Sequence, residues 1–201
     1  MTGRKVDLMA RGFPPIAAAS ARVLILGSLP GQRSINAGEY YAHPRNAFWP
    51  VIEQLFGIPA AAPYALRVNG LKECGVALWD VLHASQRRGS LDSAIDTAAA
   101  EANGIAAFLD AHRQVCLVCF NGQKAAQLYR KLVVPELRDP QPATVTLPST
   151  SPAHAAMPFA KKLDHWRIVQ TNAARKRTEG SHSPKGPAAG VTGAPRGPLH
   201  T

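Results

Sequence analysis

Apolar residues along this chain gather in four short, nearly continuous runs, at residues 22–26, 75–79, 114–120 and 143–147. An alternating run would indicate a strand with one face in water, whereas a continuous run is typical of a strand that is covered on both faces. Strands of this kind form parallel sheets packed between helices. The pattern therefore predicts a central, mainly parallel, four-stranded sheet.

Helical periodicity fills the segments between these runs. Residues 46–56 carry apolar side chains at helical spacing, and residues 91–110 and 122–133 show the same signature. Helices that alternate with parallel strands cover both faces of the sheet. The expected fold is therefore α/β, with three αβα layers.

The periodic pattern ends at residue 174. Residues 175–201 consist mostly of Gly, Pro, Ser, Ala and basic side chains, a composition typical of a disordered tail. Residues 1–12 are similarly expected to be a flexible N-terminus. Because a chain of 201 residues suits one α/β domain better than two, we expect a single folded domain at 13–174.

Basic residues clearly outnumber acidic ones. Lys and Arg total 23 against 13 Asp and Glu, which gives a formal net charge of +10 and a pI near 10.0. The expected tail holds five basic residues and one acid, so it carries +4 of this charge and the rest of the chain +6. Such an excess suits a polyanionic partner, of which nucleic acid is the commonest example.

The three cysteines do not form a metal-binding or disulfide motif. Cys116 and Cys119 lie in one apolar run, where strand alternation points them to opposite faces, so both are expected to be buried core thiols. Cys74 alone adds too few ligands for a four-thiolate site. No apolar run approaches the ~20 residues of a membrane span. We therefore expect a cytoplasmic protein without metal or other cofactor.

Polar and glycine residues follow each predicted strand directly. The segments are GSLPGQRSINAGEYYAHPRN from Gly27, Trp79-Asp80, Phe120-Asn121-Gly122, and LPSTSPAHA from Leu147. In open α/β sheets, ligands bind beyond the carboxyl ends of the strands. The four loops are therefore expected to form one site. The first loop has neither the GxSxG elbow of a hydrolase nor the lysine of a phosphate-binding loop.

Three of these stretches occur together in a known family. GSLPG at 27–31, YYAHPRNAFW at 40–49 and LPSTSPAHA at 147–155 resemble the uracil-DNA glycosylase superfamily, and most closely its hypoxanthine-DNA (deoxyinosine) glycosylase branch, family six. The resemblance spans residues 22–169. It implies a uracil-DNA glycosylase-like fold and an enzyme of DNA base-excision repair. Such an enzyme flips a deaminated base out of DNA and hydrolyses its N-glycosidic bond, leaving an abasic site.

Two catalytic positions of the better-known branches differ in this chain. In those branches, the position that matches Leu29 holds a polar residue that activates water. The position that matches Leu147 holds a polar group that supports the leaving base. The family-six pattern implies instead that an amide in the HPRN segment is catalytic, which assigns this role to Asn46. Since Asn is also a favoured helix N-cap, capping of the following helix remains an alternative.

The resemblance further implies that Gly27, Ser28, Tyr41, Asp80 and Asn121 bind the base. An ionised Asp80 can accept the lactam N–H of hypoxanthine, whereas adenine offers only a lone pair there. Uracil carries a similar N–H and is not excluded. The Tyr41 ring is expected to stack on the flipped base. The alternatives are a turn-capping role for Asp80, core packing for Tyr41 and a turn role for Asn121.

Hydroxyl, imidazole and basic side chains near these loops are expected to hold DNA phosphates or to wedge the duplex open. They are Ser34, His43, Arg45, Ser149, Thr150, Ser151 and His154. Arg87 and Arg88 are further candidates for phosphate contacts, although surface arginines are often only solvated charges.

The resulting hypothesis is a monofunctional, monomeric DNA-deoxyinosine glycosylase, a hydrolase of N-glycosyl bonds whose partner is DNA containing a deaminated base. Hypoxanthine is the first choice of base, and uracil and xanthine are alternatives. A uracil or mismatch-specific glycosylase of the same superfamily is the second hypothesis. A catalytically silent nucleic-acid-binding domain is the third, because Leu29 and Leu147 replace both usual catalytic groups.

Overall fold

The central sheet has the strand order β3-β2-β6-β7, and every neighbouring pair in it is parallel. The computed structural model describes residues 9–86 and 100–174. The strands are β2 (Val23–Gly27), β3 (Val76–Asp80), β6 (Leu117–Asn121) and β7 (Ala143–Leu147). The first three are buried along their whole length, as continuous apolar runs require. The predicted parallel sheet is confirmed.

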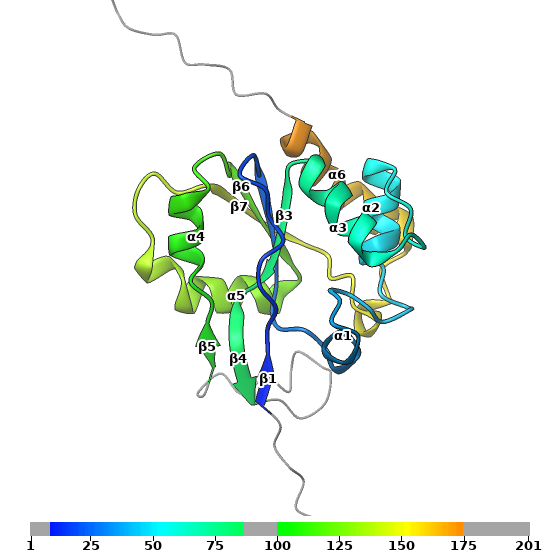
Figure 1. Ribbon diagram of the computed structural model, residues 1–201, viewed down its shortest axis with the longest axis horizontal. Coiled ribbons are helices and arrows are strands. Elements are labelled where there is room, and N and C mark those ends of the chain that lie inside the picture. Colours follow the sequence, from blue (N-terminus) through cyan, green and yellow to red (C-terminus); the bar gives the residue numbers. More distant parts are fainter. Residues whose placement is uncertain (1–8, 87–99, 175–201) are drawn as a thin grey trace, which may run out of the picture.

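Helices cover both faces of this sheet and complete the predicted αβα layers (Figure 1). Figure 1 shows α2, α3 and α6 on one side and α4 and α5 on the other. The helices are α1 (Gln32–Ala37), α2 (Phe48–Phe56), α3 (Tyr64–Glu73), α4 (Ile105–Ala111), α5 (Gln123–Leu132) and α6 (Phe159–Ala174). The short 3₁₀ turns η2 (Val134–Glu136) and η3 (Pro152–His154) lie in the connections.

The pattern predicted α2 and α5 but not α3 or α6. A buried stripe of α6, at Lys162, Trp166, Val169 and Ala173, has the spacing of one helical face and was available in the sequence. Trp166 is fully buried, and its ring meets that of Phe48 edge-on at a centroid distance of 6.0 Å. This contact packs α6 against α2, beside the loop that follows β7.

A second, antiparallel sheet lies below the first in Figure 1, with the strand order β1-β4-β5. It consists of β1 (Met9–Arg11), β4 (Leu82–Gln86) and β5 (Glu101–Ala102). The expectation of a loose N-terminus through residue 12 is wrong for residues 9–11, because they pair with β4. Pairing with a distant segment overrides a weak local pattern.

The predicted helix at 91–110 is described only from residue 100 on. Among the described residues of this range, those from Ile105 are helical, in α4, whereas Glu101–Ala102 instead pairs with β4. Ala and Glu favour a helix. However, Asn103-Gly104 breaks the helical pattern, and Glu101 and Ala102 before it form hydrogen bonds with the edge of β4. The stretch 91–99 lies outside the described residues, as do Arg87, Arg88, residues 1–8 and the predicted tail at 175–201.

The prediction of two buried core thiols is wrong for one of them. Cys119 is fully buried, and burial raises the pKa of its thiol to about 12. Cys116 is exposed because β6 begins only at Leu117, which leaves Cys116 at the amino end of the sheet, where its thiol donates to the Arg22 carbonyl over 3.5 Å.

No helix within residues 9–86 and 100–174 is long and apolar enough to cross a lipid bilayer.

Candidate active site

The loops after the four parallel strands meet around a cavity of about 220 Å³. The end of β2 and the segment after it contribute Gly27, Ser28, Ser34, Tyr41, His43 and Asn46 to the wall, and the ends of β3 and β6 contribute Asp80 and Asn121. The loop after β7 contributes Ser149, Thr150 and Ser151. The structure thus brings together the predicted base-binding residues, Asn46 and most of the predicted phosphate contacts.

Two predicted residues stand beside this cavity rather than in its wall. Arg45 precedes Asn46 and is exposed, and its N–H donates to Nδ1 of His43 over 3.1 Å. His154 is exposed at the end of η3, directly after the wall residue Ala153. Both side chains are available to a ligand larger than the cavity.

Gly27 and Asp80 form the floor of the cavity, where β2 and β3 end in register. A Cβ atom built on Gly27 would lie 2.2 Å from Asp80 Oδ1 and 3.1 Å from the Tyr41 hydroxyl. Only glycine therefore allows the carboxylate and the phenol to meet above this strand end. Asp80 is 3 % exposed, and its carbonyl accepts a hydrogen bond from Asn103 Nδ2 over 2.9 Å.

Tyr41 forms a side wall. One face of its ring stacks on Phe48 of α2, with centroids 4.1 Å apart and an interplanar angle of 21°. Phe48 is fully buried, whereas Tyr41 is partly exposed and lines the cavity. The ring is thus anchored in the core and still reaches the cavity, so core packing and base stacking are compatible for this residue.

Asn46 lines the cavity and lies directly before Ala47, the N-cap residue of α2. Its Oδ1 accepts the Phe48 N–H over 2.9 Å, so it satisfies the first N–H of the helix, but from one residue before the N-cap position that the sequence offered as an alternative. This bond fixes the orientation of the amide. An amide oxygen has two lone pairs, so Oδ1 can accept one more hydrogen bond. The neighbouring Ala47 N–H donates to the Thr150 carbonyl over 3.0 Å, which joins this segment to the loop after β7.

Asn121 and Thr150 hold each other. Asn121 Nδ2 donates to Thr150 Oγ1, and the Thr150 N–H donates to Asn121 Oδ1, each over 2.8 Å. The residues are 7 % and 1 % exposed. Both ends of the Asn121 amide are therefore engaged in fixing the last loop, a function that the FNG turn in the sequence did not indicate.

Other hydroxyls also shape the loops. Ser34 is 7 % exposed, and its Oγ accepts the Ala42 N–H over 3.2 Å. Ser149 Oγ accepts the Ser151 N–H, and Ser151 Oγ accepts the Ala153 N–H at the start of η3. These bonds make the loop walls rigid while the Ser149 and Ser151 side chains still line the cavity.

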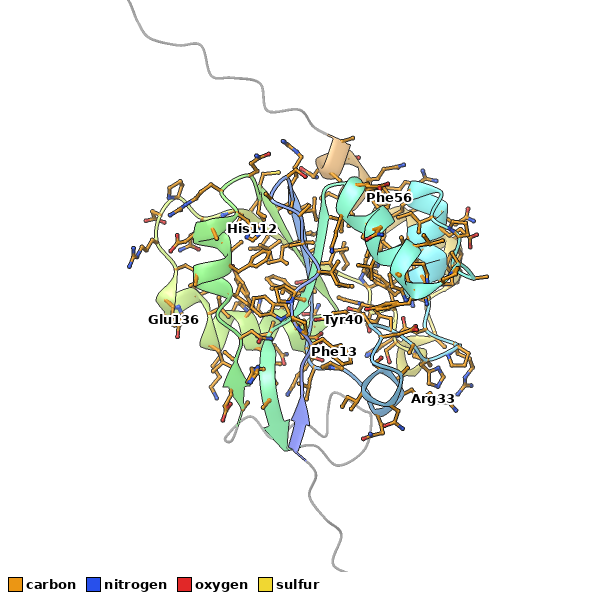
Figure 2. The ribbon with its side chains drawn as sticks, in the orientation of Figure 1. Phe13, Arg33, Tyr40, Phe56, His112 and Glu136 are labelled. Carbon is orange, nitrogen blue, oxygen red and sulfur yellow. The ribbon has the colours of Figure 1, made fainter. Side chains whose placement is uncertain are left out.

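Arg33 is a wall residue that sequence reasoning missed. It is exposed on α1, away from the central sheet in Figure 2, and it brings a positive charge to the cavity mouth. Its position in the long loop after the first strand was the available signal. Leu29 also lines the cavity, although it is 5 % exposed and packs in the hydrophobic core, whereas Leu147 is 3 % exposed and belongs to the core alone.

A buried tyrosine, Tyr40, also lines the cavity. Burial raises the pKa of the Tyr40 phenol above its ordinary value, and the Asp80 and Tyr41 charges raise it further. Tyr40 therefore stays a neutral hydroxyl at any physiological pH.

Within the described part of the chain, no group of three or more His, Cys, Asp or Glu residues has the geometry of a metal site.

Comparison with known proteins agrees with this geometry. Residues 14–173 match the uracil DNA glycosylase superfamily, and the chain belongs to that superfamily.

Among its relatives are two proteins named hypoxanthine DNA glycosylase. One, from Methanosarcina acetivorans, is 35 % identical over 164 residues, which are 81 % of this chain and 98 % of the relative. The other, from Methanosarcina barkeri, is 37 % identical over 118 residues, which are 58 % of this chain and 73 % of the relative. An NMR structure from M. acetivorans, provisionally described as a uracil DNA glycosylase, superposes with a TM-score of 0.70 at 31 % identity and covers 84 % of this chain and all of that one.

Proposed function

We propose that this protein is a DNA glycosylase that hydrolyses the N-glycosidic bond of deoxyinosine and releases hypoxanthine. The observation that carries the proposal is the floor of the cavity, where the Asp80 carboxylate and the Tyr41 ring converge above Gly27. Membership of the superfamily and the two relatives named hypoxanthine DNA glycosylase support it.

Asp80 recognises the base in this proposal by accepting a hydrogen bond from it. Hypoxanthine presents an N–H next to its carbonyl, and a carboxylate can only accept a hydrogen bond. Adenine has a lone pair at that atom, so the carboxylate repels it. Asn103 holds the backbone carbonyl of Asp80, and the carboxylate fits the space that the missing Cβ of Gly27 leaves, which favours a fixed geometry for recognition of the base. Tyr41 supplies the stacking face.

Asn46 directs the water. The C1′–N9 bond breaks as positive charge develops on the sugar, water adds to C1′, and its proton goes to solvent while the base leaves and is protonated. The protein must hold the base and place one water. The free lone pair of Asn46 Oδ1 suits this task, because the Phe48 bond already fixes the amide.

The DNA backbone lies across the cavity mouth in this proposal. Ser149 and Ser151 offer hydroxyls at the rim, and Arg33, Arg45 and His154 surround it. Phosphate contacts fix the register of the strand without reading its sequence. The contacts in this proposal need no second copy of the chain, and we propose that the protein acts as a monomer.

The direct test is a cleavage assay with oligonucleotides that carry one deoxyinosine, deoxyuridine or deoxyxanthosine, followed by alkaline cleavage of abasic sites. We expect a product band from deoxyinosine, undiminished by chelator, because the proposed chemistry uses only side chains and water. Loss of the band in chelator and its return with added zinc or iron would contradict the proposal. Cleavage of deoxyuridine alone would favour the second candidate, a uracil glycosylase, since the N–H of uracil also fits Asp80.

Replacement of Asp80 by asparagine should slow deoxyinosine cleavage far more than it weakens DNA binding. The neutral amide keeps the size of the side chain but is a weaker acceptor than the carboxylate and can turn a donor toward the lactam N–H. Single-turnover rates on deoxyinosine and deoxyuridine substrates, measured beside the dissociation constant, check this expectation. If turnover on all of these bases stayed unchanged, Asp80 would not contact the base.

A further inference from the structure

Tyr41 has an unfavourable backbone conformation. Its φ angle is 56°, and among residues 9–86 and 100–174 it is the one non-glycine residue with positive φ. Bulky side chains rarely adopt this left-handed region, so surrounding contacts must impose it. The same residue carries the ring that lines the cavity. The contacts that fix its backbone therefore also fix its ring.

Hydrogen bonds hold the backbone on both sides of Tyr41. Before it, the Tyr40 N–H donates to the Tyr64 hydroxyl of α3 over 3.0 Å. After it, the Ala42 N–H donates to Ser34 Oγ over 3.2 Å. Tyr40 is only 3 % exposed, and its ring meets that of Phe13 edge-on at 5.2 Å, near the centre of Figure 2. The loop thus has little freedom at Tyr41.

Arg67 of α3 contacts the residues that hold the backbone before Tyr41. Its Nη2 lies 3.0 Å from Glu39 Oε2, two residues before Tyr41, and its side chain is only 11 % exposed. Its guanidinium lies over the Trp49 ring at 4.5 Å and over the Tyr64 ring at 5.3 Å. Its Nε donates to the Ala62 carbonyl over 2.9 Å, which fixes the plane of the group.

Trp49 closes this arrangement. Its Nε1 donates to the Tyr40 carbonyl over 2.9 Å, and its ring meets that of Tyr64 edge-on at 6.1 Å. Both peptide groups of Tyr40 are therefore held by rings that Arg67 covers. A lysine could not make these contacts together, because they need a planar group with several donors.

We propose that Arg67 is a positioning residue for the flipped base: through Glu39, Tyr64 and Trp49 it holds Tyr41 in the conformation that presents its ring to the cavity. The inference rests on the proposed function for the role of Tyr41, and Arg67 itself lies outside the cavity wall. It extends the base-binding site to α3, a helix that contributes no wall residue.

Arg67→Met tests the inference in the full chain, because methionine keeps part of the stem but removes the guanidinium. Single-turnover cleavage of deoxyinosine DNA should slow by roughly 10–100-fold, the cost of a misplaced contact, while DNA affinity changes far less. In a Tyr41→Ala background the same substitution should have almost no further effect on the rate, because residues that act as a unit are not additive. An equal effect in both backgrounds would overturn the inference.

Arg113→Met is the matched control. Arg113 also pairs with a carboxylate, at 2.6 Å from Asp110 Oδ1, but it lies after α4 at the other end of the sheet. Its loss should leave cleavage unchanged. Rates are compared at a temperature well below the melting point of every variant.

Arg67→Lys is the conservative variant. Its cleavage rate should lie between that of Arg67→Met and that of the wild type, because lysine keeps the charge but not the planar group. Full recovery with lysine would assign the effect to charge alone and would overturn the inference.

A second readout does not depend on activity. The chain has four tyrosines, so fluorine NMR of the 3-fluorotyrosine protein gives a few resonances that Tyr→Phe variants assign. Arg67→Met should shift or broaden the Tyr41 resonance, and Arg113→Met should not. If wild-type protein cleaved none of the test DNAs, the proposed function would fail, and this spectrum alone would decide on the positioning role. A Tyr41 resonance unchanged by Arg67→Met would overturn it.

Discussion

Asn46→Ala is expected to lower the single-turnover rate of deoxyinosine cleavage by roughly two orders of magnitude or more, because loss of one positioned transition-state contact typically costs about 3 kcal/mol. DNA binding should persist, since the phosphate contacts are made elsewhere. The substitution also removes the acceptor of the Phe48 N–H, so the free energy of unfolding should fall by about 1 kcal/mol. Rapid-quench kinetics and thermal melting of the same preparation measure both effects.

Asn46→Ser separates the two roles of this residue. Serine is a good N-cap, so its hydroxyl can accept the Phe48 N–H, but it cannot reproduce the reach of the amide. We expect stability close to that of the wild type and cleavage as slow as that of the alanine variant. Near-normal cleavage by the serine variant would assign Asn46 to capping and withdraw it from the chemistry.

Gly27→Ala should abolish measurable cleavage. The new Cβ would lie 2.2 Å from Asp80 Oδ1, far inside van der Waals contact, and 3.1 Å from the Tyr41 hydroxyl. The carboxylate or the end of β2 must move, and either shift removes the proposed reading geometry. Cleavage rates and melting temperature of the variant check this expectation. Wild-type turnover would mean that Asp80 is not needed where the structure places it.

Two further variants make the glycine experiment specific. Gly104→Ala is the matched control, because its φ is −72° and a Cβ there meets no atom within 4 Å. It should leave cleavage unchanged, with at most a small loss of stability, because Gly104 is the N-cap residue of α4 and alanine is the poorer N-cap. Adding Asp80→Ala to Gly27→Ala should recover stability lost to the clash without restoring cleavage. Recovery of cleavage in this double variant would contradict a role for the carboxylate.

The position of the site could be predicted because it depends on simple periodicity. Four continuous apolar runs imply a parallel sheet, and a parallel sheet brings the ends of its strands to one edge. Gly27, Asp80 and Asn121 come directly after the predicted apolar runs and are the last residues of β2, β3 and β6, so their meeting needed no knowledge of side-chain packing. The resemblance to the superfamily then added roles that periodicity cannot supply.

The internal partners of these residues could not be predicted, because each pairing joins segments far apart in the chain. Asn121 meets Thr150 across 29 positions, and Glu39 meets Arg67 across 28. Nothing local to Asn121 indicates that its amide is occupied. The small sheet was missed for the same reason, since residues 9–11 form a strand only when β4 is beside them.

The pairing of Asn121 with Thr150 makes the last loop dependent on a residue outside it. Asn121 Nδ2 donates to the Thr150 hydroxyl and Asn121 Oδ1 accepts the Thr150 backbone N–H, and both residues are largely buried. Loss of either side chain therefore leaves a polar group of the other residue without its partner, at a cost of about 1–3 kcal/mol. The loop at 148–154 therefore cannot be exchanged between proteins by itself. A loop transplanted from a relative must bring the matching residue for position 121, and within the superfamily these two positions should be inherited as a pair.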